Sequence, residues 1–183
     1  TPRVIDERVS EDIEDFGAVC LEGAKYCGKT WTGRAFSNSE LDLMDPAGNF
    51  QNLEAAMIDP ASALEGAGPR LIDEWQEVPM LWDGVRNKVD RTGKRDRFVL
   101  TGSSVPKKKT EGGKWDAPMH SGVGRIAKLR MRPMSLYESG ESNGTVSLKG
   151  LFQGELPSSQ APGFALSDLC ELVVRGGWPA AVG

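Results

Sequence analysis

The amino-acid sequence predicts an α/β fold in which a parallel sheet is flanked by helices. Two observations support this prediction. Short apolar runs alternate along the chain with segments of helical character, and a glycine-containing loop joins the first apolar run to a helix. Strands that alternate with helices form parallel sheets, because a crossover through a helix returns the chain to the edge where the next strand begins.

The predicted elements begin with an amphipathic opening helix over residues 4–16, where apolar side chains recur at near-helical spacing among acids. Residues 17–22 form a short apolar run that is typical of a buried strand, and residues 28–36 form the helix after the glycine-containing turn. Asp59 and Pro60 are expected to stop a helix. The other predicted strands are residues 41–44, 70–73, 98–101 and 126–131, and the other predicted helices are residues 50–58, 78–89 and 166–174.

Composition and charge restrict the classes of function. The net charge of −4 argues against broad electrostatic binding of nucleic acid, although the basic run at 107–109 leaves a local contact open. No apolar run approaches the roughly 20 residues that span a bilayer. The three cysteines show no CxxC spacing and there is one histidine, so neither a disulfide framework nor a His-rich metal site is expected. A cytoplasmic protein is the expectation.

Residues 23–30 read GAKYCGKT and match the phosphate-loop pattern G-x-x-x-x-G-K-[ST]. Such an octet arises by chance in about one chain in a hundred of this length, and here it also follows an apolar strand and opens a helix. Lys29 is expected to reach the β- and γ-phosphates of ATP, and the Thr30 hydroxyl to ligate Mg²⁺. The expected nucleotide contacts are Gly23, Ala24, Lys25, Tyr26, Cys27, Gly28, Lys29, Thr30 and Trp31.

The predicted strand at 70–73 ends in two acids, Asp73 and Glu74. Alone, this pattern indicates a strand that ends in solvated charges. After a phosphate loop it indicates the Walker B position, with Asp73 holding Mg²⁺ and Glu74 orienting or deprotonating the attacking water. The pair favours hydrolysis by water over transfer onto a bound acceptor.

The chain resembles a known family in several motifs that follow one another in the same order. These motifs are KYCGKT, LIDEWQEVP, FVLTGSS, HSGVGRI, LRMRPMSLYESGES and RGGWP. They are similar to those of prokaryotic AAA-type ATPases that carry a C-terminal domain of unknown function. The resemblance spans residues 2–179 and implies a P-loop core of the AAA/RecA-like type, with Lys29, Thr30, Asp73 and Glu74 as the hydrolytic set.

The resemblance also implies a domain organisation. Residues 1–183 are expected to form one AAA-type ATPase domain, made of an opening helix (1–16), a nucleotide-binding core (17–140) and a helical extension (141–183). The extension is expected to lead to a C-terminal effector domain that this chain lacks, and ATP would drive or gate that domain. A homo-oligomer is a further arrangement that remains open.

Two further groups are weaker candidates for catalysis. In ATPases of the AAA type, a polar residue at the end of the strand at 98–101 senses the γ-phosphate, and Thr101 and Ser103 are the candidates here. A plain Gly-Ser turn is the alternative. Arg125 is a candidate for stabilising charge in the transition state, although a lone arginine before a strand is as often structural.

Two other functions compete with an ATPase. A small-molecule kinase would need an acceptor pocket and several arginines near the γ-phosphate, and Arg91, Arg95 and Arg97 are the nearest cluster. A nucleotide switch would bind ATP with negligible hydrolysis, which Glu74 argues against. Phosphate release with and without candidate acceptors separates these functions from hydrolysis by water.

Cys27 lies inside the phosphate loop, immediately before Gly28 and Lys29. The helix N-terminus and the Lys29 ammonium are expected to favour its thiolate, so a thiol reagent would modify it faster than Cys20 and would block nucleotide binding. A buried, inert thiol that fills space is an equally good interpretation of the same residue.

Overall fold

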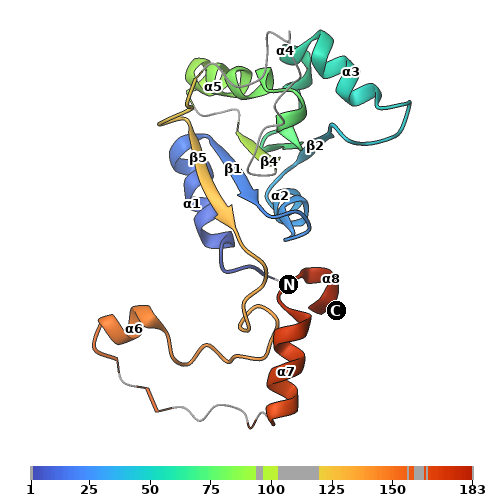
Figure 1. Ribbon diagram of the computed structural model, residues 1–183. Helices are drawn as coiled ribbons and strands as arrows, with labels where there is room; N and C mark the ends of the chain where they lie inside the picture. The colour runs from blue at the N-terminus through green and yellow to red at the C-terminus, as the bar shows by residue number, and fades with distance from the viewer. Residues whose placement is uncertain are drawn as a thin grey trace. The chain divides into compact units, whose positions relative to one another are not determined.

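The computed structural model describes residues 2–93, 97–102, 120–155, 157–158, 163 and 165–182. The chain divides into two compact units (Figure 1). The larger unit is Ile5–Arg132, and the smaller one consists of the described residues of 1–4 and 133–183. The division falls between Arg132 and Pro133, a few residues before the expected end of the nucleotide-binding core at 140.

The larger unit contains an all-parallel sheet, which confirms the predicted α/β fold. Within the described residues the sheet has five strands in the order β2-β3-β4-β1-β5. β1 is the central member of three strands, because Ala18 pairs with Phe98 on one side and with Ile126 on the other. The strands are β1 (Ala18–Gly23), β2 (Ser39–Asp42), β3 (Arg70–Asp73), β4 (Phe98–Gly102) and β5 (Ile126–Met131).

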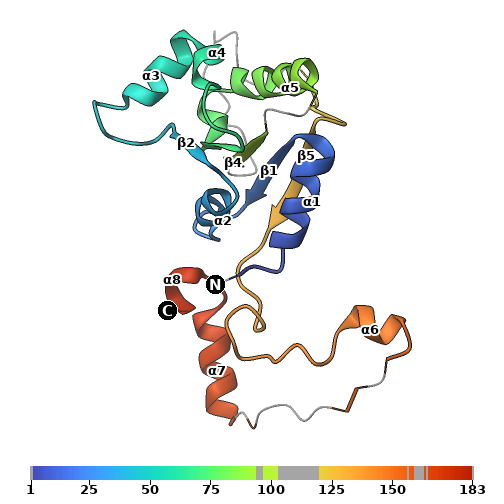
Figure 2. The ribbon, with the colours of Figure 1, turned by 180° about the vertical axis from the view of Figure 1, so that it is seen from behind.

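The helices of the larger unit lie on both faces of the sheet, with α1 on one face and α5 on the other (Figures 1 and 2). They include one short 3-10 turn, η1, which follows β3. The helical elements are α1 (Asp6–Phe16), α2 (Lys29–Ala35), α3 (Gln51–Ile58), α4 (Pro60–Ala63), η1 (Trp75–Glu77) and α5 (Met80–Thr92).

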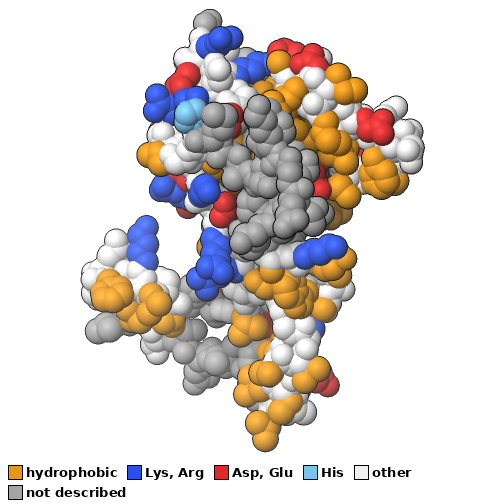
Figure 3. All heavy atoms as spheres, turned by 45° about the horizontal axis from the view of Figure 1, so that its top comes forward, with side chains coloured by type: hydrophobic (Ala, Val, Ile, Leu, Met, Phe, Trp, Pro, Cys, Tyr) orange, Lys and Arg blue, Asp and Glu red, His pale blue; other side chains and the backbone are white. Residues whose placement is uncertain are grey.

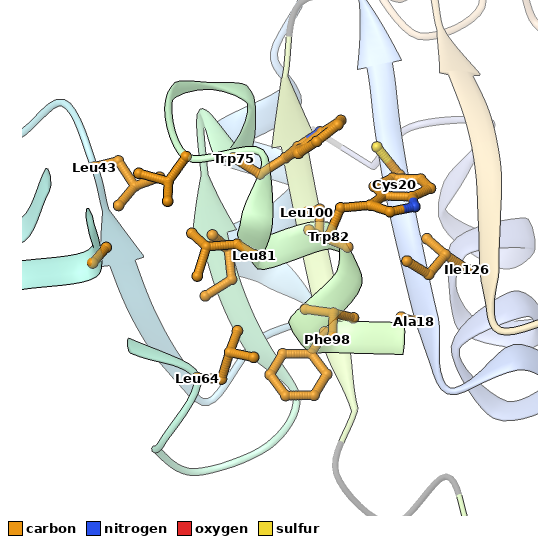
Figure 4. Close-up of a cluster of buried hydrophobic side chains, with 14 of the residues drawn as sticks. Ala18, Cys20, Leu43, Leu64, Trp75, Leu81, Trp82, Phe98, Leu100 and Ile126 are labelled. Atoms are coloured by element: carbon orange, nitrogen blue, oxygen red, sulfur yellow. The ribbon is translucent and has the colours of Figure 1, made fainter. Parts of the chain in front are cut away.

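Alternation along β1 shows why both faces are covered. Ala18 and Cys20 join the cluster beneath α5, whereas Val19 and Leu21 join the cluster beneath α1. Successive side chains of a strand point to opposite faces, so a strand that is apolar at every position needs a helix on each side. Figure 4 shows the α5 cluster, in which the rings of Trp75 and Trp82 lie 4.8 Å apart between their centroids.

Two departures from the predicted elements have a local reason. The second strand was expected at 41–44 but spans Ser39–Asp42, because Asp42 Oδ1 accepts a hydrogen bond from the Met44 N–H at 2.8 Å and turns the chain there. Asp59 ends α3 and also starts α4, since its Oδ1 accepts from the backbone N–H of Ala61 and Ser62, each at 3.1 Å. An expected stop is therefore also an N-cap.

Helix α2 approaches the sheet closely at Gly33. A Cβ added there would lie 2.8 Å from Leu71 Cδ1 on β3 and 3.2 Å from Thr101 Cγ2 on β4. Leu71 and Thr101 are completely buried, so neither side chain has room to move away. The glycine thus lets the helix that follows the phosphate loop rest directly on two strands.

The smaller unit contains α6 (Leu148–Phe152), α7 (Leu166–Arg175) and α8 (Pro179–Val182). Its first residues are attached through Glu138, which accepts from Arg3 Nε at 2.8 Å and from the Val4 N–H at 2.9 Å. Partial burial acts to raise the pKa of Glu138, but hydrogen bonds from Ser135, Arg3 and Val4 outweigh it and lower the pKa to about 2.

Hydrophobic side chains are exposed along α7 (Figure 3). They include Leu166, Leu169, Val173 and Val174. Over the described part of the chain, no helix combines the length and apolar character that crossing a bilayer requires.

We expect Gly33→Ala to lower the stability of the larger unit. Alanine favours a helix interior by about 1 kcal/mol over glycine, but a methyl group forced into a packed site costs about 1–3 kcal/mol. The net loss should reduce the melting temperature by about 2–4 °C, measured by circular dichroism.

The matched control is Ala35→Gly, the reverse change at an exposed position of the same helix. This control measures only the difference in helix propensity between alanine and glycine, at most about 1 kcal/mol. A Gly33→Ala protein that melts above wild type would show that α2 has room for the methyl group.

Candidate functional site

The phosphate loop connects the end of β1 to the start of α2. Gly23 pairs with Met131, and a Cβ at Gly23 would overlap the Met131 carbonyl oxygen and lie 3.1 Å from Cys27 Sγ. Two residues of the loop have left-handed backbone, Tyr26 with φ 67° and Gly28 with φ 103°. The loop is therefore a tight turn pressed against β5, and glycine at position 23 is required by that close approach.

Lys29 folds back over the loop that precedes it. Its Nζ donates to the carbonyl oxygens of Gly23 at 3.1 Å and Ala24 at 2.9 Å, and the residue is only 6% exposed. The ammonium is thus held inside the curve of the loop by the loop's own backbone. A positive charge in this place is suited to an anionic ligand such as a phosphate group.

Two hydroxyl groups, those of Thr30 and Thr101, meet at the carboxylate of Asp73, which ends β3. The Thr30 hydroxyl of α2 lies 3.1 and 3.0 Å from the two carboxylate oxygens, and the Thr101 hydroxyl of β4 donates to Oδ1. Burial raises the pKa of Asp73 above its ordinary value, and the negative charges of Asp42 and Glu74 raise it further. The hydrogen bonds from Thr101 and Thr30 act in the opposite direction.

Glu74 follows Asp73 in an unusual backbone conformation, with φ 58° and ψ 42° in the left-handed region. Its N–H donates to Thr101 Oγ1 at 3.4 Å, and its Oε2 accepts from Gln76 Nε2. The chain turns sharply here, so the carboxylates of Asp73 and Glu74 have different partners although they are adjacent in sequence. Hydrogen bonds therefore join Thr30, Asp73, Glu74 and Thr101, and Lys29 lies next to Thr30 at the start of α2.

Two residues of this site, Asp42 and Gln76, were not predicted from the sequence. Asp42 pairs with Asp73 across β2 and β3, and carboxylate oxygens of Glu40, Asp42 and Asp73 all lie within 4.8 Å of one another. Glu40 is also bound by Arg34, at 2.6–2.9 Å. The predicted strand at 41–44 placed Asp42 inside the strand, whereas the observed strand ends at Asp42 and so puts it at the same edge of the sheet as Asp73.

The remaining residues in and beside the loop differ in how far their side chains are exposed. Cys27 is completely buried and its Sγ lies 3.8 Å from the Met131 carbonyl oxygen, on the β5 side of the loop. Tyr26 and Trp31 are mostly exposed, and the Lys25 ammonium lies 5.1 Å from the centroid of the Tyr26 ring. Of these residues, the aromatic rings and not the thiol are open to a ligand.

One predicted catalytic residue, Arg125, is not brought to this group. Arg125 Nε donates to Asp90 Oδ1 at 2.7 Å, and Arg125 precedes β5 next to Ile126, which pairs with Ala18 at the beginning of β1. It therefore lies at the edge where strands begin, opposite the edge where the phosphate loop starts. Ser103 lies outside the described residues.

A separate cavity of about 680 Å³ borders α4 and α5. It contains none of the residues that the sequence predicts for nucleotide or metal binding. Both charge signs line it, as shown by Asp83, Glu65, Arg86 and Arg91.

Comparison with known proteins identifies the family. A sequence profile described as an AAA domain matches residues 15–140, which is more than half of the chain. No curated protein sequence matches the chain. The matched range includes the phosphate loop, the acid pair and Thr101. Because the profile covers most of the chain and these residues converge at one edge of a parallel sheet, the chain belongs to the AAA domain family, whose P-loop binds nucleotides.

Proposed function

We propose that this chain binds ATP with Mg²⁺ and hydrolyses it. The observation that carries the proposal is the junction at Asp73, where hydroxyls from α2 and β4 meet one buried carboxylate beside the phosphate loop. In P-loop ATPases the residue after the loop lysine and an acid at a strand end together serve the metal. Membership of the AAA family supports nucleotide binding. The hydrogen bonds of Thr30 and Thr101 to Asp73 support the proposal that the bound ATP is hydrolysed.

Phosphate binding would use the loop backbone and Lys29. The lysine is already inside the loop curve, held by the carbonyl oxygens of Gly23 and Ala24. To reach the β- and γ-phosphates it exchanges these neutral acceptors for charged ones, which form stronger hydrogen bonds. The exposed rings of Tyr26 and Trp31 offer apolar surface close to the loop in sequence.

The residues at the junction fit Mg²⁺, since hydroxyl and carboxylate oxygens are the ligands that this ion prefers. Thr30 and Asp73 would hold it, and Asp42 adds a third oxygen donor close by. When bound, Mg²⁺ neutralises charge on the phosphate oxygens as the bond to the leaving group breaks. Thr101 keeps the Asp73 carboxylate in place and is the candidate for sensing the γ-phosphate.

Glu74 would act as the general base. It follows the metal-binding acid directly, and its carboxylate accepts a hydrogen bond from Gln76 while its backbone is tied to Thr101. A carboxylate held in this way accepts a proton from water as the oxygen attacks the γ-phosphate.

Transfer to a small-molecule acceptor is less well supported. Arg97 is paired with Glu14, with Nη2 at 2.8 Å from Oε2, and it stands just before β4. Arg91 lines the separate cavity near the end of α5. Neither arginine is at the edge where the phosphate loop starts. In the proposed function, turnover drives or gates an effector domain of the same protein, as the family resemblance implies.

We expect Lys29→Ala to abolish ATP binding, because the loop loses the ammonium that lies inside its curve. Isothermal calorimetry with MgATP on the folded variant checks this. Lys149→Ala, the same change at an exposed lysine of α6, is the control and should bind as wild type. Unchanged affinity in Lys29→Ala would reject the loop as the phosphate site.

Glu74→Gln is expected to retain ATP binding and to lose hydrolysis by roughly 10²–10⁴-fold, the usual contribution of a general base. The amide keeps the shape of the side chain but cannot accept the proton. Phosphate release and calorimetry measure the two properties separately. Glu77→Gln, a charge removal three positions along, serves as the control, and equal turnover in both variants would dismiss Glu74 as the base.

The cysteines should react with a thiol reagent in the order of their accessibility. Cys170 is exposed and should be modified first, and burial raises the pKa of Cys20 to about 12, so that thiol should be inert. Cys27 is buried against β5 and should react only when the loop opens. MgATP should slow its labelling further, as followed by mass spectrometry. If Cys27 were labelled as fast as Cys170, with or without MgATP, the phosphate loop would not bury Cys27 in solution.

A further inference from the structure

We propose that Gln76 is a positioning residue for Glu74, and that its amide holds the Glu74 carboxylate in the orientation that accepts a proton from water. This role rests on the proposed ATPase function. Gln76 belongs to η1, the 3-10 turn that begins immediately after Glu74.

The backbone brings the two side chains together. The left-handed conformation of Glu74 ends β3 with a sharp turn, and Gln76 lies two residues later with its Nε2 donating to Glu74 Oε2. A carboxylate has about four acceptor positions on its two oxygens. A hydrogen bond to Oε2 therefore fixes the carboxylate while the other oxygen stays able to accept a proton.

The burial of Gln76 indicates that stability alone does not explain an amide here. The residue is 6% exposed, and its Oε1 is buried with no hydrogen-bond partner among the residues that the structure describes. A buried polar atom without a partner is unfavourable, and a methionine of similar size would avoid it. The contact that favours an amide is the one to Glu74.

The end of β4 leaves room for the amide of Gln76. A Cβ at Gly102 would overlap Gln76 Oε1 and would lie 3.0 Å from Trp75 Nε1, so the glycine leaves the space that the amide fills. The hydroxyl oxygen of Thr101, the preceding residue of β4, accepts a hydrogen bond from the Glu74 N–H. Glu74 is thus held at two points, at its backbone N–H by Thr101 of β4 and at its carboxylate by Gln76 of η1.

Gln76→Met tests this role because it keeps the length of the side chain and removes the donor. We expect kcat for ATP hydrolysis to fall by about tenfold to a hundredfold, the range for a misplaced catalytic group. KM and the affinity for MgATP should stay within about twofold, since the base acts in the chemical step. Gln153→Met, the same change at an exposed position after α6, should leave kcat unchanged.

Gln76→Leu is the second variant, because it also lacks the N–H donor and places no charge beside Glu74. We expect a similar loss of kcat. Thermal melting of both variants establishes that they are folded.

A double variant separates positioning from general structural support. If Gln76 acts only through Glu74, then Glu74→Gln combined with Gln76→Met turns over at the rate of Glu74→Gln alone. A structural contribution would instead lower the residual rate again, by the factor seen in Gln76→Met.

The possible failures are distinguishable. Wild-type kcat in both Gln76 variants, or a second fall in the double variant, overturns the positioning role and leaves the ATPase proposal standing. A wild-type protein that does not hydrolyse ATP overturns the proposed function and this role together. A Glu74→Gln variant that hydrolyses ATP normally removes Glu74 as the base, and with it the role of Gln76, while ATP hydrolysis itself stands.

Discussion

The buried carboxylate of Asp73 is the constraint on which the arrangement of the site depends. A carboxylate removed from water is unfavourable unless hydrogen bonds replace its hydration. Here the replacements come from Thr30 on α2 and Thr101 on β4, two elements far apart in sequence. The three elements must therefore meet at one point, and the absence of a side chain at Gly33 allows α2 to come close enough. The hydrogen bonds of the Asp73 carboxylate thus hold α2, the helix after the phosphate loop, against the sheet.

The parallel arrangement of the strands determines which residues lie near Asp73. Because all strands run in the same direction, their last residues share one edge, which places Gly23, Asp42, Asp73 and Gly102 there. The helices on both faces keep this edge rigid by burying alternate side chains of β1, β3 and β4. Polar groups are held at the edge while apolar groups stabilise the sheet beneath them. The same register places Arg125 at the opposite edge, where it binds Asp90.

The sequence predicted the parallel sheet and the phosphate-loop pattern because both depend on local patterns of residues. Continuous apolar runs mark strands that are buried on both faces, and the spacing of glycine, lysine and threonine marks the loop. Asp42 and Gln76 could not be found in this way. Asp42 becomes a neighbour of Asp73 only through strand pairing, and Gln76 reaches Glu74 only through a left-handed turn. The start of α4 was missed because the side chain of Asp59 caps a new helix at the residue that ends the previous one.

The left-handed backbone of Glu74 has an evolutionary consequence. A non-glycine residue in that conformation costs roughly 1–3 kcal/mol, whereas glycine and asparagine adopt it readily. In the proposed function, a lineage released from selection for turnover would gain stability by replacing this glutamate with glycine or asparagine. We expect the amino acid at this position to distinguish descendants that still consume nucleotide from descendants that only hold it.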